Sequence, residues 1–149
     1  MFFITEKDPG IIPQVLTQIL DNCVNGVTLA DPDLPDMPIV YANEAFEKIT
    51  GYTREEVIGQ NCRFLQGEHR DEAKHAQIRE AIKNCQPIEI NLKNYKKNGD
   101  LFYNHLALTP LFDQEGNLIY YLGIQYDVTG QETAEQEVER LSEELQKYK

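Results

Sequence analysis

The sequence predicts an α+β fold, in which a five-stranded antiparallel sheet carries short helices on one face and a flanking helix lies at each end of the chain. Three observations predict it. Two short apolar runs with strand character come first, and a region of helical periodicity follows them. Apolar and polar residues then alternate over longer segments, and the chain closes with apolar residues at heptad spacing.

A chain of 149 residues with 41% hydrophobic residues suffices for one domain with a core and an appendage. We expect an N-terminal extension with a cap helix over residues 1–24, the core over 25–129 and a linker helix over 130–149. The net charge of −11 repels phosphate backbones and anionic lipid, so nucleic acids and membranes are not expected as partners. A local pair of arginines can still bind a small anion.

The N-terminal third is predicted to contain one helix and two strands. Apolar residues at helical spacing indicate a short amphipathic helix that ends at Asn22. These residues are Val15, Leu16, Ile19 and Leu20. Residues 27–30 and 39–42 are predicted strands, and the turn-rich run 31–36 forms the tight connection between them.

Three helices are predicted in the middle of the chain. Asn43 can cap a helix that Gly51 stops, and Thr53 opens a second short helix with capping-box spacing. Asp71 caps a longer helix that ends at residues 84–87. Its inner stripe is expected to consist of Ala73, Ala76, Ile78, Ala81 and Ile82.

The period changes to that of strands after this helix. Ile88, Ile90 and Leu92 alternate with polar residues, as in a half-buried strand. Asn98 and Gly99 then predict a hairpin that leads into a strand over residues 101–111. A turn at 113–117 connects it to the last strand, over 118–128.

The C-terminal segment is predicted to be a helix that starts directly after the last strand. Thr129 opens it with capping-box spacing. Apolar residues then follow in steps of four and three, at Ala134, Val138, Leu141, Leu145 and Tyr148. An isolated helix of this length is marginal in water, so we expect it to pack on the sheet, to pair with a copy of itself in a homodimer, or both. Because the pattern still runs at Lys149, we expect it to continue into an effector at least as readily as to end the protein.

The cysteines indicate a reducing compartment. Cys23, Cys62 and Cys85 are odd in number, and the sequence contains neither a Cys-x-x-Cys pair nor a secretory leader. We therefore expect free thiols and a cytoplasmic location.

Cys62 admits three interpretations from the residues alone. Arg63 beside it can stabilise a thiolate for nucleophilic or redox work. His69 and His75 suggest a Cys/His catalytic pair or a metal site, but their spacing matches no common zinc pattern and no side chain obviously orients a base. The commonest fate of a free cysteine is a buried structural role, which the residues alone favour.

A run of nine residues around Cys62 changes this interpretation. Residues 59–67, Gly-Gln-Asn-Cys-Arg-Phe-Leu-Gln-Gly, resemble the signature of LOV domains, the flavin-binding light sensors of the PAS superfamily. Further segments resemble the family in order and spacing, namely residues 31–36, 51–53, 94–95, 102–104 and 123–127. The resemblance covers residues 25–129, nearly all of the expected globular part.

The resemblance implies a flavin site centred on Cys62. Its thiol would add to flavin carbon C4a after light has brought the flavin to its triplet state, so neither a catalytic base nor a metal is expected. Arg63 and Arg79 would hold the flavin phosphate, because guanidinium offers paired donors in a fixed fork. The interval from Cys62 to Arg79 lacks the insertion that houses an adenine in some relatives, which favours FMN over FAD.

The resemblance also implies which residues surround the flavin. Asn94, Asn104 and Gln125 would face the polar edge of the ring, since carboxamides can pair with both its acceptors and its donors. Asn61 and Gln66 would contact the ribityl chain. The ring faces would be lined by Thr28, Phe46, Leu65, Ile78, Ile82, Leu92, Leu106 and Leu108. Thr28 replaces an aliphatic residue of relatives, and Leu106 stands where many plant members have phenylalanine.

The expected function is blue-light sensing by a module that is not itself an enzyme. Gln125 is the expected switch, because it can answer a proton on flavin N5 and lies four residues before Thr129. The C-terminal helix would then control dimerisation or an attached effector such as a kinase or a nucleotide cyclase. Two alternatives are a PAS domain that senses redox state or a ligand without photochemistry, and an enzyme that uses Cys62 and a histidine.

Overall fold

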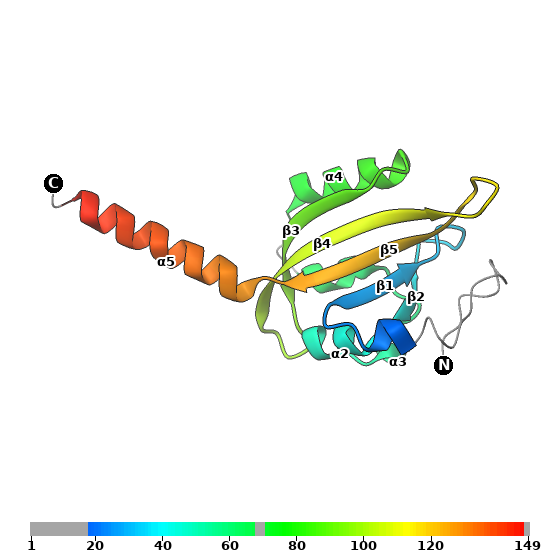
Figure 1. Cartoon of the computed structure of the whole chain (residues 1–149), viewed down its shortest axis with the longest axis horizontal. Helices are drawn as coiled ribbons and strands as arrows, with labels where there is room; N and C mark the ends of the chain where they lie inside the picture. Colours follow the sequence, from blue (N-terminus) through cyan, green and yellow to red (C-terminus); the bar gives the residue numbers. More distant parts are fainter. Residues whose placement is uncertain (1–17, 68–70, 148–149) are drawn as a thin grey trace.

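The computed structural model describes residues 18–67 and 71–147, with backbone only at 132 and 133. Its centre is a five-stranded antiparallel sheet of strand order β2-β1-β5-β4-β3, which confirms the predicted α+β fold. The strands are β1 (Gly26–Ala30), β2 (Ile39–Ala42), β3 (Ile88–Tyr95), β4 (Leu101–Phe112) and β5 (Leu118–Asp127). The first two strands and the last three therefore meet at β1 and β5, in the middle of the sheet (Figure 1).

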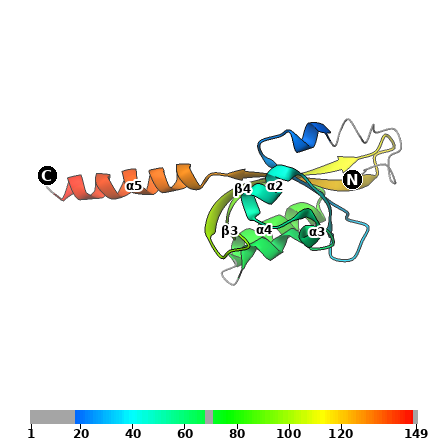
Figure 2. The same cartoon turned by 90° about the horizontal axis from the view of Figure 1, so that it is seen from below.

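The short helices lie together on one face of the sheet (Figure 2). They are α2 (Glu44–Thr50), α3 (Arg54–Val57), the 3₁₀-helix η1 (Cys62–Gln66) and α4 (Glu72–Lys83). A helical turn over residues 18–21 lies on the opposite face. It is the end of the predicted N-terminal helix, whose Val15 and Leu16 lie outside the described residues.

Local capping signals correctly predict where three of these helices begin. The Asn43 side chain accepts a hydrogen bond from Phe46 N, and Gly51 ends α2 with a φ of 79°, in the left-handed region that favours glycine. Thr53 and Glu56 form both hydrogen bonds of a capping box at α3. Asp71 caps α4 through two backbone amides.

The predicted inner stripe of α4 is partly wrong. Ile78 is buried, but Ala73 and Ala76 are exposed. Ile78, Arg79 and Ile82 line a cavity, and Ile78 and Ile82 also pack against apolar residues of β3 and β4. Alanine is common on helix surfaces because of its helix propensity, so its spacing alone is a weak sign of burial.

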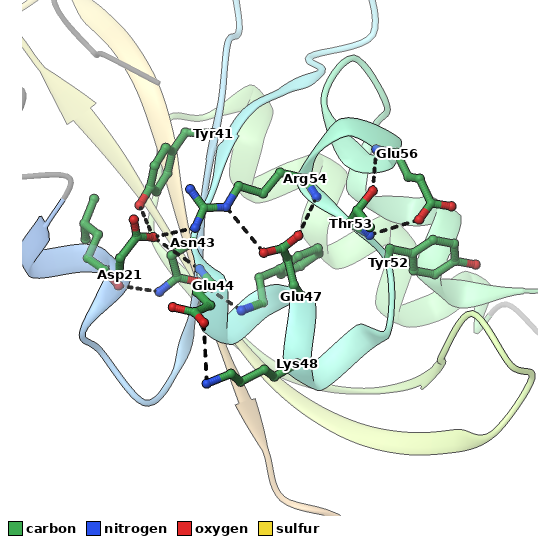
Figure 3. A network of polar contacts seen from close by, with 12 residues as sticks. Asp21, Tyr41, Asn43, Glu44, Glu47, Lys48, Tyr52, Thr53, Arg54 and Glu56 are labelled. Carbon is green, nitrogen blue, oxygen red and sulfur yellow. Dashed lines mark hydrogen bonds and ion pairs between the residues drawn. The ribbon is translucent and has the colours of Figure 1, made fainter. Parts of the chain in front are cut away.

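The opposite face of the sheet is closed partly by the N-terminal segment. Leu20 packs there against a cluster of Leu29, Tyr41, Ile119 and Tyr120. A polar network at the sheet edge ties the same segment to α2 and α3 (Figure 3).

Asp21 is the centre of that network. Its carboxylate accepts a hydrogen bond from the Tyr41 hydroxyl at 3.4 Å and pairs with the Arg54 guanidinium at 3.1 Å. Arg54 also pairs with Glu47 of α2 at 3.5 Å. The N-terminal segment is thus held by apolar packing and by charge.

Helix α5 (Thr129–Gln146) follows β5 directly, as predicted, and extends away from the sheet (Figure 1). The predicted Thr129 cap is wrong. The helix has Val128 at its N-cap and no side-chain cap, because the Thr129 hydroxyl accepts a hydrogen bond from Tyr103 N at 2.9 Å and donates one to Asp127 at 2.6 Å. Among the described helices, none is both long and apolar enough to cross a membrane.

Candidate functional site

A cavity of about 380 Å³ lies between the helical layer and the inner face of the sheet. Residues of η1, α4, β3, β4 and β5 line it, together with the loop between β1 and β2. All predicted site residues except Thr28 and Phe46 lie on its wall. These are Asn61, Cys62, Arg63, Leu65, Gln66, Ile78, Arg79, Ile82, Leu92, Asn94, Asn104, Leu106, Leu108 and Gln125.

Three carboxamides reach the cavity from three neighbouring strands. Asn94, Asn104 and Gln125 are each only 2% exposed. The Asn104 amide donates to Asn94 Oδ1 at 2.9 Å, and the Asn94 amide donates to the Lys93 carbonyl at 3.0 Å. Alternation along the strands explains their common direction, because positions two apart share one face of the sheet.

Three oxygens at this site are buried and, among the described residues, lack a hydrogen-bond partner. They are Gln66 Oε1, Asn104 Oδ1 and Gln125 Oε1. Leaving such a group unpaired costs about 1–3 kcal/mol. A ligand that presents N–H or O–H donors to these oxygens would remove this cost, so these acceptors fit the polar edge and hydroxylated chain of a flavin.

Apolar side chains supply the remaining walls. Ile78 and Ile82 from α4 face Leu92, Leu106 and Leu108 from the sheet across the cavity. A flat apolar ring system can fit between two such layers, with its polar edge toward the carboxamides. The site therefore combines an apolar slot with a few buried polar groups.

Cys62 is the first residue of η1, and Asn61 caps this turn by accepting a hydrogen bond from Arg63 N. Burial raises the pKa of the Cys62 thiol. A backbone hydrogen bond of Cys62 and the charge of Arg63 lower this pKa, but by less than burial raises it. The thiol is therefore protonated at neutral pH. A catalytic thiolate needs a lowered pKa, so the environment of Cys62 argues against the Cys/His enzyme.

Thr28 and Phe46 do not line this cavity, so their expected contact with the ring faces stays a prediction. The Thr28 hydroxyl accepts a hydrogen bond from Gln125 Nε2 at 3.4 Å and so contacts a lining residue. Phe46 is fully buried in a cluster with Ile39 and Leu65, because α2 packs directly on this part of the sheet. Thr28 and Phe46 therefore each contact a residue that lines the cavity, Gln125 and Leu65 respectively.

The two arginines differ in their surroundings. Arg63 forms an ion pair with Asp36, whose loop also lines the cavity. Arg79 reaches the cavity from α4, and it forms no ion pair with another residue in the described ranges. Both guanidiniums line the cavity, and guanidinium offers the paired donors that suit an anionic group.

Some lining residues were missed from the sequence. Pro32, Leu34, Asp36 and Met37 come from the loop before β2, and His75 comes from α4. His75 was considered only as a catalytic or metal-binding partner of Cys62. Its spacing of three and four residues from Ile78 and Arg79 indicates the same helix face and could have placed it in the wall. Within the described ranges, no group of three or more His, Cys, Asp or Glu residues could hold a metal ion.

Comparison with known proteins identifies the family. The model of the PAS domain matches residues 24–130. The solved LOV domain of the blue-light activated histidine kinase from Erythrobacter litoralis EL346 is 44% identical, with a TM-score of 0.67 over 70% of this chain and 96% of that domain. This chain is a LOV domain of the PAS family.

Longer proteins also contain regions similar to this chain. The blue-light photoreceptor of Listeria innocua is 42% identical over 133 residues, which are 89% of this chain and 52% of that protein. A solved RNA-binding light-oxygen-voltage receptor is 38% identical with a TM-score of 0.82, over 90% of this chain and 38% of that receptor. The chain thus spans about half the length of the Listeria relative.

Proposed function

We propose that this LOV domain senses blue light through a reversible covalent bond between Cys62 Sγ and carbon C4a of a bound flavin, FMN. The observation that carries this proposal is one cavity that holds both the protonated Cys62 thiol and three buried oxygens that lack a hydrogen-bond partner in the described part of the chain. The thiol supplies the reacting atom, and the three oxygens supply hydrogen-bond acceptors for the polar edge of the ring.

A flavin held in this cavity would supply the reactivity at C4a when it absorbs blue light. The Cys62 thiol would give up its S–H bond, with its sulfur bonding to C4a and its proton passing to N5. Atoms and electrons balance without an outside oxidant or reductant. Because the thiol keeps its proton until light arrives, its raised pKa is compatible with the reaction.

The residues of the cavity would hold FMN by three kinds of contact. Arg63 and Arg79 would bind the phosphate with paired N–H donors. Asn94, Asn104 and Gln125 would pair with the polar edge of the ring, and Asn61 and Gln66 with the ribityl hydroxyls. The apolar slot would hold the two faces of the ring. Because η1 and α4 are close in sequence, without an insertion to house an adenine, FMN is favoured over FAD.

The signal would leave through Gln125 and β5. A donor at flavin N5 would attract Gln125 Oε1, and Gln125 lies two residues before Asp127 on the same strand. Asp127 accepts a hydrogen bond from Thr129, which in turn accepts one from the backbone of Tyr103. A small shift of β5 would thus disturb this junction and bias α5, through which the domain would control dimerisation or an effector.

An absorption spectrum before and after blue light tests the proposal. The purified protein should be yellow, and its blue absorption band should bleach and recover in the dark. Cys62→Ala should stay yellow but fail to bleach, because no thiol remains to add to C4a. Cys85→Ala should behave like the wild type, because Cys85 is exposed and does not line the cavity.

Two outcomes would contradict the proposal. Bleaching of Cys62→Ala to the wild-type extent would exclude the assigned thiol. A colourless protein that takes up no flavin would favour a PAS sensor of another ligand.

A further inference from the structure

Asp36 places a carboxylate beside one of the two arginines of the cavity. It lies in the loop between β1 and β2 and forms an ion pair with Arg63, and both residues line the cavity. Their side chains are 59% and 41% exposed, so the pair lies on the solvent-facing side of the site. This is the side on which the charged end of FMN would lie, because the phosphate is the most strongly hydrated part of the molecule.

The backbone around Asp36 is built to hold this arrangement. Asp36 has a φ of 66° and Met37 a φ of 45°, so two consecutive residues with side chains adopt the sparsely populated left-handed region. The Asn61 amide donates to the Asp36 carbonyl at 2.7 Å, while Asn61 Oδ1 accepts from Arg63 N at 3.0 Å. Asn61 therefore connects the backbones of the two charged residues and fixes them as neighbours.

Charge distinguishes the two sides of the phosphate region. Arg79 on α4 forms no ion pair with any other described residue, whereas the guanidinium of Arg63 is already bound by Asp36. A phosphate that approaches Arg63 must share its donors with this carboxylate and is repelled by it. A flavin without a phosphate does not need the Arg63 guanidinium, so the Asp36 carboxylate should not change its affinity.

We propose that Asp36 limits the preference of this site for FMN over riboflavin by competing with the flavin phosphate for Arg63. This inference rests on the proposed flavin-binding function. Asp36 is then a specificity-determining residue that lowers the advantage the two arginines would otherwise give to the phosphorylated flavin. The opposite role, in which Asp36 orients Arg63 and strengthens phosphate binding, predicts the opposite sign.

Flavin exchange on the holoprotein measures this preference. Protein loaded with FMN is incubated with increasing riboflavin at low ionic strength, and the bound and released flavins are quantified to give the ratio of the two dissociation constants. Asp36→Asn should raise the preference for FMN about tenfold, as expected for the loss of one nearby like charge. The affinity for riboflavin should change less than about twofold, and the gain should shrink in about 1 M salt.

Asparagine is the suitable replacement because it tolerates the left-handed backbone and can still hydrogen-bond to Arg63. Asp33→Asn is the matched control, since it removes the same charge from the same loop at a residue that does not line the cavity. It should leave the ratio unchanged. In an Arg63→Gln background, Asp36→Asn should change the ratio less than about twofold, because the contested guanidinium is gone.

The inference is overturned if Asp36→Asn leaves the ratio unchanged or lowers it, or if its full gain persists without Arg63. These results differ from failure of the proposed function. A wild-type protein that binds neither FMN nor riboflavin refutes flavin binding itself, whereas binding of both with an unchanged ratio refutes only the role of Asp36.

Discussion

Asn43 is a fully buried side chain that joins three segments of the chain. Its Oδ1 accepts hydrogen bonds from the backbone amides of Val27 at 2.8 Å and Phe46 at 3.1 Å, and its Nδ2 donates to the carbonyls of Leu20 at 2.7 Å and Asn25 at 3.1 Å. Asn43→Ala leaves these buried groups without partners. We expect it to lower the free energy of unfolding by about 2–4 kcal/mol, measured by urea denaturation.

Asn117→Ala, at an exposed turn, serves as the control and should cost about 1 kcal/mol or less. A loss for Asn43→Ala no greater than that of this control would show that the four contacts contribute little.

Gln125 is the residue at which the proposed signal begins. Gln125→Leu should leave light-induced bleaching largely intact, because Cys62 supplies the reacting thiol. It should strongly reduce the light-dependent change in α5, because leucine cannot answer a proton on flavin N5. Hydrogen exchange of the α5 amides in the dark and under illumination measures this response. Gln86→Leu, at an exposed position, should respond like the wild type, and an undiminished α5 response in Gln125→Leu would remove Gln125 from the pathway.

The cavity shows what could be predicted from the sequence at the level of residues. The family motif and strand alternation together predicted most of the wall, including Asn94, Asn104 and Gln125. Asp36 was missed, because no pattern of residue types reveals that its backbone is left-handed and turns its side chain to Arg63. Phe46 is a buried core residue of α2, as its spacing in the helix predicts, and its expected contact with the flavin stays a prediction.

At the level of elements, the predicted helix cap is wrong where a residue far away in the sequence binds the capping side chain. The caps at Asn43, Thr53 and Asp71 depend on residues within one turn and were predicted correctly. Thr129 has the same local signal, but its hydroxyl is bound to the backbone of Tyr103, 26 residues earlier. The stripe of α4 is wrong at Ala73 and Ala76 for another reason, because alanine is also favoured on exposed helix surfaces and its spacing does not reveal burial.

Helix α5 carries an unpaired apolar stripe that fits a second copy of itself. Val138, Leu141 and Leu145 are 63%, 45% and 67% exposed and occupy the a and d positions of a heptad repeat. In a parallel pair, Glu137 at a g position faces Ser142 of the other helix, whereas an antiparallel pair opposes Glu137 to Glu144. The charges therefore favour a parallel dimer.

If α5 pairs as proposed, Leu141→Glu should weaken the proposed dimer at least about tenfold, because it places a charge in the apolar seam. Sedimentation equilibrium in the dark and under blue light gives the association constant. Gln146→Glu introduces the same charge at an exposed position outside the apolar seam and should leave the constant unchanged. Equal association of both variants would show that α5 is not the dimer interface.

Two tyrosines hold layers to the sheet on its two sides. Tyr121 donates from the sheet to the carbonyl of Ile82 in α4 at 2.9 Å, on the cavity side. Tyr41 donates to Asp21 of the N-terminal segment on the other side. Burial raises the pKa of Tyr121 to about 12, with a smaller contribution from Cys85, and burial together with the Asp21 carboxylate raises the pKa of Tyr41 well above its usual range. Both hydroxyls therefore keep their protons longer in the folded than in the unfolded protein.

The sign of the resulting pH dependence follows from linkage. An unfolded tyrosine ionises near pH 10, so above this pH the unfolded state binds fewer protons than the folded state, and stability falls as pH rises. The contribution of both tyrosines should be fully present below about pH 9 and should be lost progressively from about pH 10 to pH 12 and beyond. The urea midpoint, measured across this pH range, should fall less steeply in Tyr121→Phe, because phenylalanine has no hydroxyl to titrate. The variant should also be less stable at every pH, because its hydrogen bond to the Ile82 carbonyl is lost. Tyr126→Phe is the control, because the half-buried Tyr126 takes part in neither of these two hydrogen bonds, and it should keep the wild-type slope. An equally steep fall in Tyr121→Phe would mean that the attachment of α4 does not depend on the Tyr121 proton.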